Sequence, residues 1–338
     1  MRRTRSGILA GLLISVFAST GPGAAQESVP VRTAPVAAFD AQHPEQTRFG
    51  SLRYLGGLQI DSADSRLGGL SGIEITPDGR TVTLVSDIGD LFSGTLDYTD
   101  GVLTGLSGLT VSRLPGEDGR PLSEKYGSDA ESLRSTAGNG QRSGFLIGFE
   151  RDTRILAYPV GGDGSFGTPK RVAMPAAVSR LPYNKGLEGI AVIPERAPNA
   201  GATVAFSESV PDDGSSVIPG WLIVDGQTRD IGLRRTDDFD LTDIVALPDG
   251  DLIVLERRFN MLMGVAMRVR RLRAAELNGP QPMTGEYLFT AGMAYAVDNM
   301  EGVAVHHDED GRTVLTIVSD DNFSALQRTL LLQFELVE

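Results

Sequence analysis

Carboxylates recur at two places in a repeated sequence pattern, and they are the strongest chemical signal in the chain. The first set stands at the start of an apolar run and comprises Glu131, Glu188, Asp243 and Glu301, with Ser71 in the same place of the first repeat. The second set closes the next apolar run and comprises Asp87, Glu150, Glu208, Glu256 and Asp320. Carboxylates brought close together raise one another's pKa values or require a counter-cation. Oxygen ligands suit Ca²⁺ or Mg²⁺, so the pattern predicts a metal site.

Basic residues beside these acids allow two interpretations. Arg151, Lys185 and Arg257 are the nearest such bases in the sequence. Acids at strand ends commonly cap turns or pair with neighbouring bases without any ligand. The same bases would otherwise bind the oxygens of a phosphate as its charge builds up in a transition state. The recurrence of the acids as a set favours the metal site, because five separate turns do not each need a charge in one place.

The elements that would position these acids form a nearly regular repeat, with registers at positions 72, 132, 189, 243 and 302. Each repeat holds β-branched runs, and hairpin dipeptides such as Asp78-Gly79 and Asp249-Gly250 separate the first two. Two further apolar runs follow in most repeats. Four strands per repeat predict an all-β fold, a β-propeller of about five four-stranded blades. Equivalent positions of successive blades surround one axis, so the acids would form rings at the mouth of a central channel.

Closure of the ring can be predicted from the last repeat, which extends only from Gly302 to Glu338. This leaves room for about three strands, and we expect the run 52–60 to supply the fourth. Such an exchange removes two open sheet edges. A sixth blade is the alternative, if residues 99–125 hide a divergent repeat. A closed ring is one domain, which we expect to cover residues 48–338.

Composition excludes several classes of protein. The 338 residues include 41 Gly and no Cys, so a disulfide scaffold is excluded, as is a zinc site built on Cys. The net charge is −13, and it becomes −16 without the segment 1–25, which carries three Arg and no acid. A chain this acidic repels nucleic acid and anionic membranes unless a bound cation intervenes.

The segment 1–25 has the features of a signal peptide. Three Arg precede the apolar run 8–18, and Gly23-Ala24-Ala25 is a small-residue cleavage site. An uncleaved anchor is the alternative, but the run is shorter than the roughly 20 residues that span a bilayer. We therefore expect a periplasmic or secreted protein with no integral membrane span after cleavage. Residues 26–47 have no periodicity and are predicted to be a flexible lead-in.

Other chemistries are less well supported by the sequence. The segments 69–73 and 105–109 both miss the G-x-S-x-G pattern of a serine esterase. His306 and His307 are adjacent, and adjacent strand residues point to opposite faces, so both cannot enter one site. We expect them in a solvated turn, with a general acid as the alternative role for one of them.

We expect structural roles for three methionines, for the neighbouring basic cluster and for two aromatic residues. We expect Met261, Met263 and Met267 to pack within a blade, and Arg268 and Arg270 to face solvent on an outer strand, the alternative being a partner surface. Trp221 and Tyr183 are expected to pack at strand starts, the alternative being that they stack on a ring of the substrate.

Five motifs resemble the bacterial phytase-like family described as having esterase-like activity of phytase. They are S-D-A-E-S at 128–132, N-K-G-L-E-G-I-A-V at 184–192, L-E-R-R-F at 255–259, N-M-E-G-V-A-V at 299–305 and V-S-D-D-N at 318–322. The resemblance covers residues 55–338. It implies a β-propeller with repeated acidic positions and a phosphoester or phosphodiester hydrolase.

The resemblance also implies which residues of this chain form the site. The recurring acids of the family correspond to Glu131, Glu188 and Glu301, with Glu150, Glu208, Glu256 and Asp320, and its accompanying bases to Lys185 and Arg257. The first and fourth repeats depart from the pattern, with Ser71-Gly72 and Thr242-Asp243. The expected site is therefore biased toward blades two, three and five.

The expected function is divalent-metal-dependent hydrolysis of a small phosphorylated substrate by a monomer. Glu131, Glu188, Glu301, Lys185 and Arg257 are the candidate catalytic residues, and Asp87, Glu150, Glu208, Asp243, Glu256 and Asp320 are the candidate ligands of Ca²⁺ or Mg²⁺. The alternative is a non-catalytic propeller in which Ca²⁺ is structural and the loops bind a protein, a glycan or a lipid headgroup.

Overall fold

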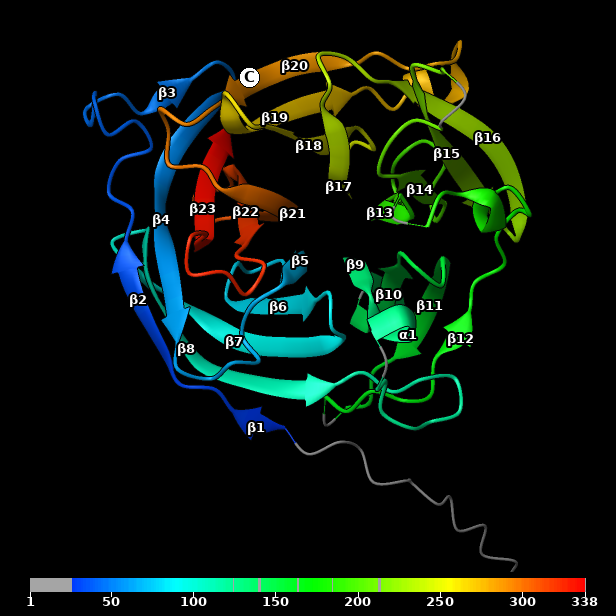
Figure 1. The fold of residues 1–338 in the computed structure, drawn as a ribbon, viewed down its shortest axis with the longest axis horizontal. Helices are drawn as coiled ribbons and strands as arrows, with labels where there is room; N and C mark the ends of the chain where they lie inside the picture. The colour runs from blue at the N-terminus through cyan, green and yellow to red at the C-terminus, as the bar shows by residue number, and fades with distance from the viewer. Residues whose placement is uncertain are drawn as a thin grey trace, which may run out of the picture.

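Five antiparallel sheets surround one central axis (Figure 1). This computed structural model describes residues 26–123, 125–138, 141–162, 164–183, 185–211 and 214–337. The predicted signal peptide, residues 1–25, lies outside these ranges. The arrangement is a five-bladed β-propeller, which confirms the predicted fold.

Each blade is built of four strands, and in each the inner strand, next to the axis, is followed along the chain by the second and third. The fourth strand also follows in blades 1 to 4, whereas that of blade 5 comes from the N-terminal side. Blade 1 consists of β5 (Leu70–Ile75), β6 (Thr81–Ser86), β7 (Asp90–Thr99) and β8 (Val102–Arg113). Blade 2 consists of β9 (Ala130–Gly138), β10 (Gln141–Phe149), β11 (Arg154–Pro159) and β12 (Lys170–Arg171). Blade 3 consists of β13 (Leu187–Val192), β14 (Thr203–Ser207), β15 (Val217–Val224) and β16 (Gln227–Arg234). Blade 4 consists of β17 (Asp240–Ala246), β18 (Leu252–Asn260), β19 (Gly264–Leu272) and β20 (Glu286–Ala291). Blade 5 consists of β21 (Asn299–His307), β22 (Thr313–Asp320), β23 (Thr329–Leu336) and β4 (Leu52–Ser62).

The ring closes as the sequence predicts. β4 pairs antiparallel with β23, from Ile60 opposite Thr329 to Leu52 opposite Leu336. The segment considered for a sixth blade, 99–125, instead supplies β8 and leads into the short helix α1 (Lys125–Ser128). In the described part of the chain the number of blades is therefore five.

Residues 26–47 differ from the expected flexible lead-in. β1 (Glu27–Ser28) pairs with β8, and β2 (Val31–Pro35) pairs with β4. A further short strand, β3 (Arg48–Phe49), also pairs with β4. An exposed sheet edge offers unpaired backbone groups, and β2 satisfies those of β4. Two 3₁₀ turns (Val178–Arg180 and Glu276–Asn278) complete the elements. No helix of the described residues is long and apolar enough to span a membrane.

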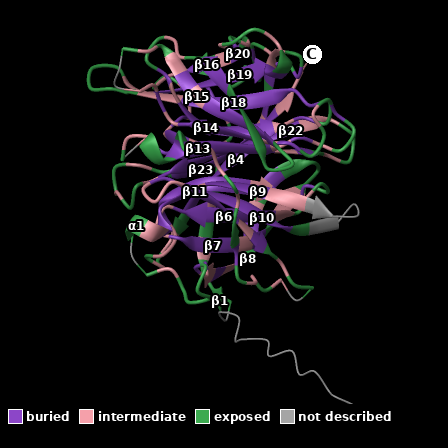
Figure 2. Cartoon of the chain, turned by 90° about the vertical axis from the view of Figure 1, so that its right-hand side faces the viewer, coloured by how far each residue is buried: buried purple, intermediate pink, exposed green. Residues whose placement is uncertain are grey.

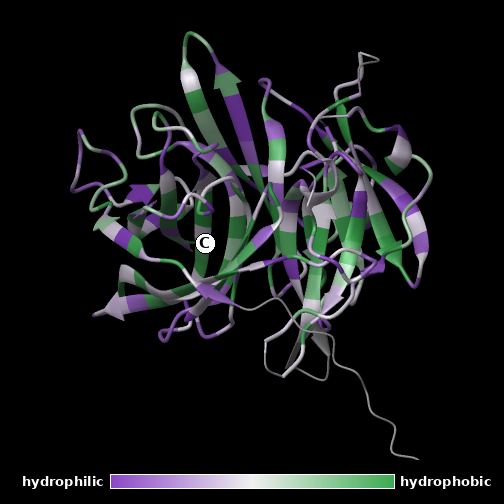
Figure 3. Cartoon of the chain, turned by 60° about the horizontal axis from the view of Figure 1, so that its bottom comes forward, coloured by the Kyte–Doolittle hydropathy of each residue, from purple (hydrophilic) through white to green (hydrophobic). Residues whose placement is uncertain are grey.

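The core lies between neighbouring blades. Buried residues are concentrated in the strands, and exposed residues in the loops (Figure 2). The strands also carry most of the apolar residues (Figure 3). Between blades 4 and 5 the rings of Phe39, Phe49 and Phe334 pack together, with centroids 5.0 to 5.1 Å from Phe39. Phe39 and Phe49 belong to the N-terminal segment, which explains why that segment is held against the propeller.

The central axis is filled by an ion pair. Arg134 on β9 lies with Nη2 2.6 Å from Oδ1 of Asp243 on β17. The same guanidinium donates to the carbonyl oxygens of Ile73 on β5 and Val303 on β21, at 3.1 and 3.0 Å. Four of the five inner strands are thereby joined at the axis. A cavity of about 300 Å³ lies on one side of Arg134, at the C-terminal ends of the inner strands. The ion pair therefore separates this cavity from the mouth of the ring at the N-terminal ends of the inner strands.

The β18–β19 hairpin corrects two sequence predictions. Arg270 is fully buried and Arg268 nearly so, rather than facing solvent. Their guanidinium groups lie over aromatic rings, with Arg268 4.0 Å from the centroid of Phe239 and Arg270 4.9 Å from that of Tyr287. Carboxylate partners and aromatic rings stabilise the buried charge, which alternation along a strand cannot reveal.

The methionines of this hairpin also differ from the expectation. Met267 is buried as predicted, but Met261 and Met263 are exposed at the hairpin tip, 92% and 66% respectively. His306 is also corrected, since it lies on β21 and is buried rather than in a solvated turn, with only His307 exposed.

Candidate functional site

A β-bulge at the start of every inner strand brings one side chain per blade to the same mouth of the ring. The pairing shifts between Leu70 and Gly72, and equivalently in the other blades. A bulge leaves one extra residue whose side chain is redirected. The bulged residues are Ser71, Glu131, Glu188, Thr242 and Glu301.

The second set lies where the second strand of each blade ends. The backbone N–H groups of Asp87, Glu150 and Glu208 donate hydrogen bonds of 2.7 to 3.0 Å. In each case the acceptor is the carbonyl oxygen of the residue directly before the inner strand of the same blade. In blade 5 Asp320 occupies this place, opposite Asn299. In blade 4 the place belongs to Arg257, opposite Asp240. Blade 4 therefore contributes a hydroxyl and a base to the mouth, and no acid at either position.

This register corrects the places predicted for Asp243 and Glu256. Each stands one residue away from the equivalent position, and a shift of one residue turns a strand side chain to the other face. Asp243 points to the axis, where it pairs with Arg134 and accepts the backbone N–H of Val303 at 2.8 Å. Glu256 is fully buried and accepts two hydrogen bonds from Arg270, at 2.5 and 3.0 Å. The structure thus places both carboxylates in internal ion pairs.

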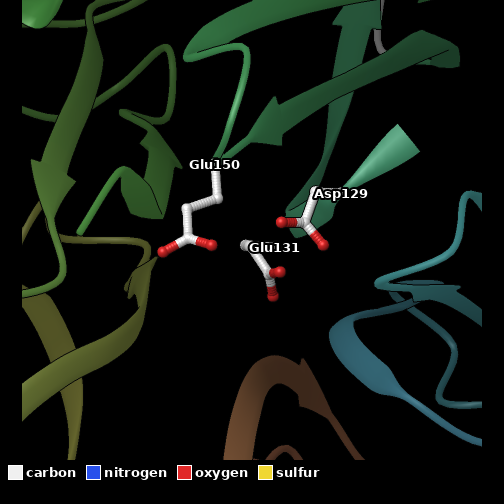
Figure 4. A group of neighbouring side chains, drawn as sticks. All are labelled: Asp129, Glu131 and Glu150. Atoms are coloured by element: carbon white, nitrogen blue, oxygen red, sulfur yellow. The ribbon is translucent and has the colours of Figure 1, made fainter. Parts of the chain in front are cut away.

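Blades 2 and 3 bring their carboxylates together at the mouth. Oxygen atoms of Asp129, Glu131 and Glu150 lie within 4.8 Å of one another, and their carboxylates face a common space (Figure 4). Oxygen atoms of Glu150, Glu188 and Glu208 lie within the same distance of one another. Glu150 belongs to both groups, so the two triads form one continuous cluster.

Asp129 was missed by sequence reasoning. It stands directly before β9, and the motif S-D-A-E-S contains it beside Glu131. The signal was an acid in this motif at the position that Gly69 and Gly186 occupy in blades 1 and 3.

Two of the remaining acids at the mouth, Asp87 and Glu301, have cationic or side-chain amide partners. Oδ2 of Asp87 lies 2.5 Å from Nζ of Lys125, a base that the sequence analysis did not single out. Glu301 accepts a hydrogen bond of 2.7 Å from the side chain of Asn299. Nε of Arg257 lies 3.3 Å from Glu301, and its Nη2 lies 3.8 Å from Glu208. Arg257 therefore bridges acids of blades 3 and 5.

Bases also lie on the blade-2 side of the cluster. Nε of Arg151 is 2.9 Å from Oδ2 of Asp129, and Nζ of Lys125 is 3.7 Å from its Oδ1. Lys185 is half-buried on the segment that leads into β13, and it precedes Gly186, whose backbone packs against Glu150. The predicted base therefore lies on a segment that adjoins the triads.

Burial dominates the electrostatics of the cluster. It raises the pKa of Glu150 and of Glu208 to about 7, and the charge of Asp129 adds to the effect on Glu150. The pKa values of Glu131 and Glu188 are raised well above the usual range, by burial first and by neighbouring carboxylates second. Asp320 has its pKa raised to about 7, again chiefly by burial. Carboxylates with such shifts release their protons readily only when a cation compensates their charge.

The donor atoms of the two triads fit a hard divalent cation. Every donor is a carboxylate oxygen, the type that Ca²⁺ and Mg²⁺ prefer, and neither triad contains a softer nitrogen or sulfur ligand. Two buried carboxylate oxygens in this region, Oδ1 of Asp87 and Oδ2 of Asp129, make no hydrogen bond, although the second is ion-paired with Arg151. Such atoms are rare in folded proteins, and a bound cation would satisfy them.

Comparison with known protein families gives a match over most of the chain. Residues 65–323 match the model of the Phytase-like family, described as esterase-like activity of phytase. The match contains both carboxylate triads and the inner strands of all five blades. No curated protein matches the chain significantly.

Proposed function

This chain belongs to the phytase-like family, and from that membership we propose that it is a divalent-metal-dependent hydrolase of a small phosphoester or phosphodiester. The observation that carries the proposal is the pair of carboxylate triads that share Glu150 at one mouth of the propeller. A surface with so much negative charge repels a phosphate unless cations are bound. The cluster would therefore repel the substrate when it is free of metal and bind its phosphate when cations are present.

The two triads define where cations would be held. Asp129, Glu131 and Glu150 would supply the ligands of one position, and Glu150 with Glu188 and Glu208 those of a second. When bound, Ca²⁺ or Mg²⁺ supplies neutralisation of the phosphate charge and acidification of a water molecule. Asp87, Glu301 and Asp320 remain further candidate ligands at the same mouth.

The bases of this chain orient the substrate. The guanidinium of Arg257, already aligned by Glu208 and Glu301, binds non-bridging phosphate oxygens from the blade-4 side. Neighbouring acids, Glu301 foremost, raise the pKa of Arg257, so its charge is permanent. Lys125 and Arg151 provide positive charge on the opposite, blade-2 side. A phosphate between these two sides is held by charge from both, which favours the more highly charged transition state.

A second candidate function is a non-catalytic propeller in which the cations are structural. The exposed β18–β19 hairpin tip favours it, because Met261, Leu262 and Met263 form an exposed apolar surface. Exposed apolar patches often bind other molecules. We further propose, from the sequence alone, that the chain is exported by its signal peptide and acts as a monomer.

The test is hydrolysis of p-nitrophenyl phosphate and bis(p-nitrophenyl) phosphate by purified protein, first in EDTA and then with excess Ca²⁺ or Mg²⁺. We expect activity only with the cation, and a loss of about 100-fold or more in Glu150→Gln. Glu309→Gln removes an acid whose side chain is 88% exposed and ion-paired with Arg80, so it is the matched control and keeps full activity. Activity that persists in EDTA, or in Glu150→Gln, contradicts the proposal. No hydrolysis of either ester under any cation favours the non-catalytic propeller.

A further inference from the structure

Two tyrosines are exposed beside the carboxylate triads, on the segments that lead into blades 2 and 3. Tyr126 lies on α1, shortly before Asp129 and β9, and Tyr183 lies on the segment that leads into β13. Their side chains are 53% and 58% exposed, and their rings stack with centroids 6.1 Å apart and planes at 26°. Trp221, the other aromatic considered for a ring-binding role, is buried in blade 3. Exposure of two aromatic rings to water is unfavourable, and this pair does not contribute to the core.

The tyrosine pair is connected to the acidic cluster through two cations. The guanidinium of Arg151 lies 5.6 Å from the ring centroid of Tyr183, while its Nε lies 2.9 Å from Asp129. Lys125 adjoins Tyr126 in the chain, and its ammonium contacts both Asp87 and Asp129. The rings therefore lie one side chain away from the carboxylates that would hold the cations.

The segments that carry the tyrosines are fixed against blade 2. The carbonyl oxygen of Gly127 accepts a hydrogen bond of 2.6 Å from the buried guanidinium of Arg154, which anchors α1. Gly186 lies so close to Glu150 that an added Cβ would stand 2.6 Å from the Glu150 carbonyl oxygen. Side chains on restrained backbone lose less conformational entropy when a ligand orders them. The rings are thus presented as a preformed surface rather than as parts of free loops.

We propose that Tyr126 and Tyr183 form a specificity subsite that stacks on a planar aromatic leaving group while the phosphate occupies the acidic mouth. The inference rests on the proposed phosphoester hydrolase function. Stacked and offset aromatic rings attract one another beyond the effect of buried area, whereas saturated rings lack this term. The subsite would therefore favour aryl and nucleoside-type phosphoesters over phosphoesters of alkyl or saturated cyclic alcohols.

Binding of phosphonates tests the subsite without turnover, because they lack the ester bond. Methyl-, cyclohexyl- and phenylphosphonate are titrated by calorimetry into Ca²⁺-loaded protein. We expect all three to bind, with phenylphosphonate about 3- to 10-fold tighter than cyclohexylphosphonate. Cyclohexyl and phenyl groups have similar size, so their ratio isolates the aromatic contribution.

Variants separate stacking from bulk. Tyr126→Leu and Tyr183→Leu keep an apolar side chain but should bring the phenyl-to-cyclohexyl ratio to about one, while Phe at either position keeps it. Leu326→Ala, which removes an exposed apolar side chain that lies outside the subsite, is the control and leaves the ratio unchanged. The melting temperature with Ca²⁺ identifies any variant that acts by unfolding.

The outcomes distinguish this inference from the function on which it rests. Equal affinities for phenyl- and cyclohexylphosphonate, with methylphosphonate still bound, overturn the subsite and leave the phosphate site standing. A ratio that survives both Leu variants also overturns it. Failure of all three phosphonates to bind Ca²⁺-loaded protein overturns the proposed function and the subsite together.

Discussion

The stability of the metal-free protein should fall as pH rises, and cations should reverse this fall only at the higher pH. The groups responsible are Glu150 and Glu208, whose pKa values burial raises to about 7 from 4.5. Between these two values the folded state binds more protons than the unfolded state. The free energy of unfolding therefore decreases as pH rises from about 4.5 to about 7, and the loss is complete above the folded-state pKa.

The magnitude follows from the size of the shift. A pKa unit corresponds to about 1.4 kcal/mol, so a carboxyl with this shift costs about 3 kcal/mol when it is ionised in the folded state. At about 2.1 cal/mol/K of unfolding entropy per residue, a chain of this size changes its melting temperature by roughly 1.5 °C per kcal/mol. One such group thus accounts for about 5 °C. Because the carboxyls interact, their effects are not additive.

The assay is calorimetric melting at pH 5.5 and pH 8, in EDTA and in excess Ca²⁺. Between these pH values one such group loses about 2 kcal/mol of its contribution, so in EDTA we expect a melting temperature at least about 3 °C lower at pH 8 than at pH 5.5. Ca²⁺ should raise it at pH 8 and have little effect at pH 5.5, where protons occupy the cluster. Glu150→Gln should stabilise the EDTA-treated protein at pH 8 by about 3 kcal/mol and abolish much of the Ca²⁺ effect, whereas Glu309→Gln should do neither. An EDTA-treated protein equally stable at both pH values, or a Ca²⁺ effect of equal size at both, would refute the reasoning.

Three further predictions concern other parts of the molecule. Arg134→Met leaves Asp243 buried without its partner and should lower the free energy of unfolding by about 3 to 5 kcal/mol in a denaturant titration. The double variant with Asp243→Leu should recover most of this loss. An Arg134→Met protein as stable as the wild type would contradict the role of this ion pair. Arg257→Gln should lower kcat/KM for p-nitrophenyl phosphate about tenfold or more, because it removes a positive charge that binds the phosphate. Ca²⁺ binding should not weaken, because the charge removed beside the ligands is positive. A parallel loss of Ca²⁺ affinity by calorimetry would show that Arg257 supports the cluster instead. Leu262→Ser at the hairpin tip should leave hydrolysis and melting temperature unchanged, and a loss of activity would mean that the hairpin belongs to the site.

Much of the fold could be predicted because it depends on periodicity and edge closure. The even spacing of the five registers and the short last unit predict five blades and the use of the run 52–60 to complete the ring, which β4 confirms. The lead-in was missed because its strand β2 has no alternating pattern. Its pairing depends on the open edge of β4, which is a property of the assembled sheet.

The candidate site could be predicted only in part. Glu131, Glu188 and Glu301 are correctly placed at one mouth, because they share a position relative to Gly or Ser at the next residue. In blade 4 the repeat places a carboxylate one residue away from the equivalent position on each strand, and alignment by residue type selected Asp243 and Glu256. Bulge position and strand pairing decide which face a side chain takes, and a single sequence contains neither.

Residues brought in by tertiary structure were the least predictable. Asp129 and Lys125 reach the mouth from the segment before β9, and Lys125 meets Asp87 of blade 1. Arg270 was expected in solvent because arginines alternate along β19, yet Glu256 on the neighbouring strand provides its buried partner. Such pairings join positions of different strands or blades, so local patterns do not indicate them.

The most direct test of the central claim is calorimetric titration of Ca²⁺ into chelator-treated protein at pH 7.5. The two triads that share Glu150 predict two bound Ca²⁺ per chain, with both affinities lowered about tenfold or more in Glu150→Gln and unchanged in Glu309→Gln. Absence of Ca²⁺ binding, or binding that Glu150→Gln leaves intact, would contradict the assignment of the cation site to this mouth of the propeller.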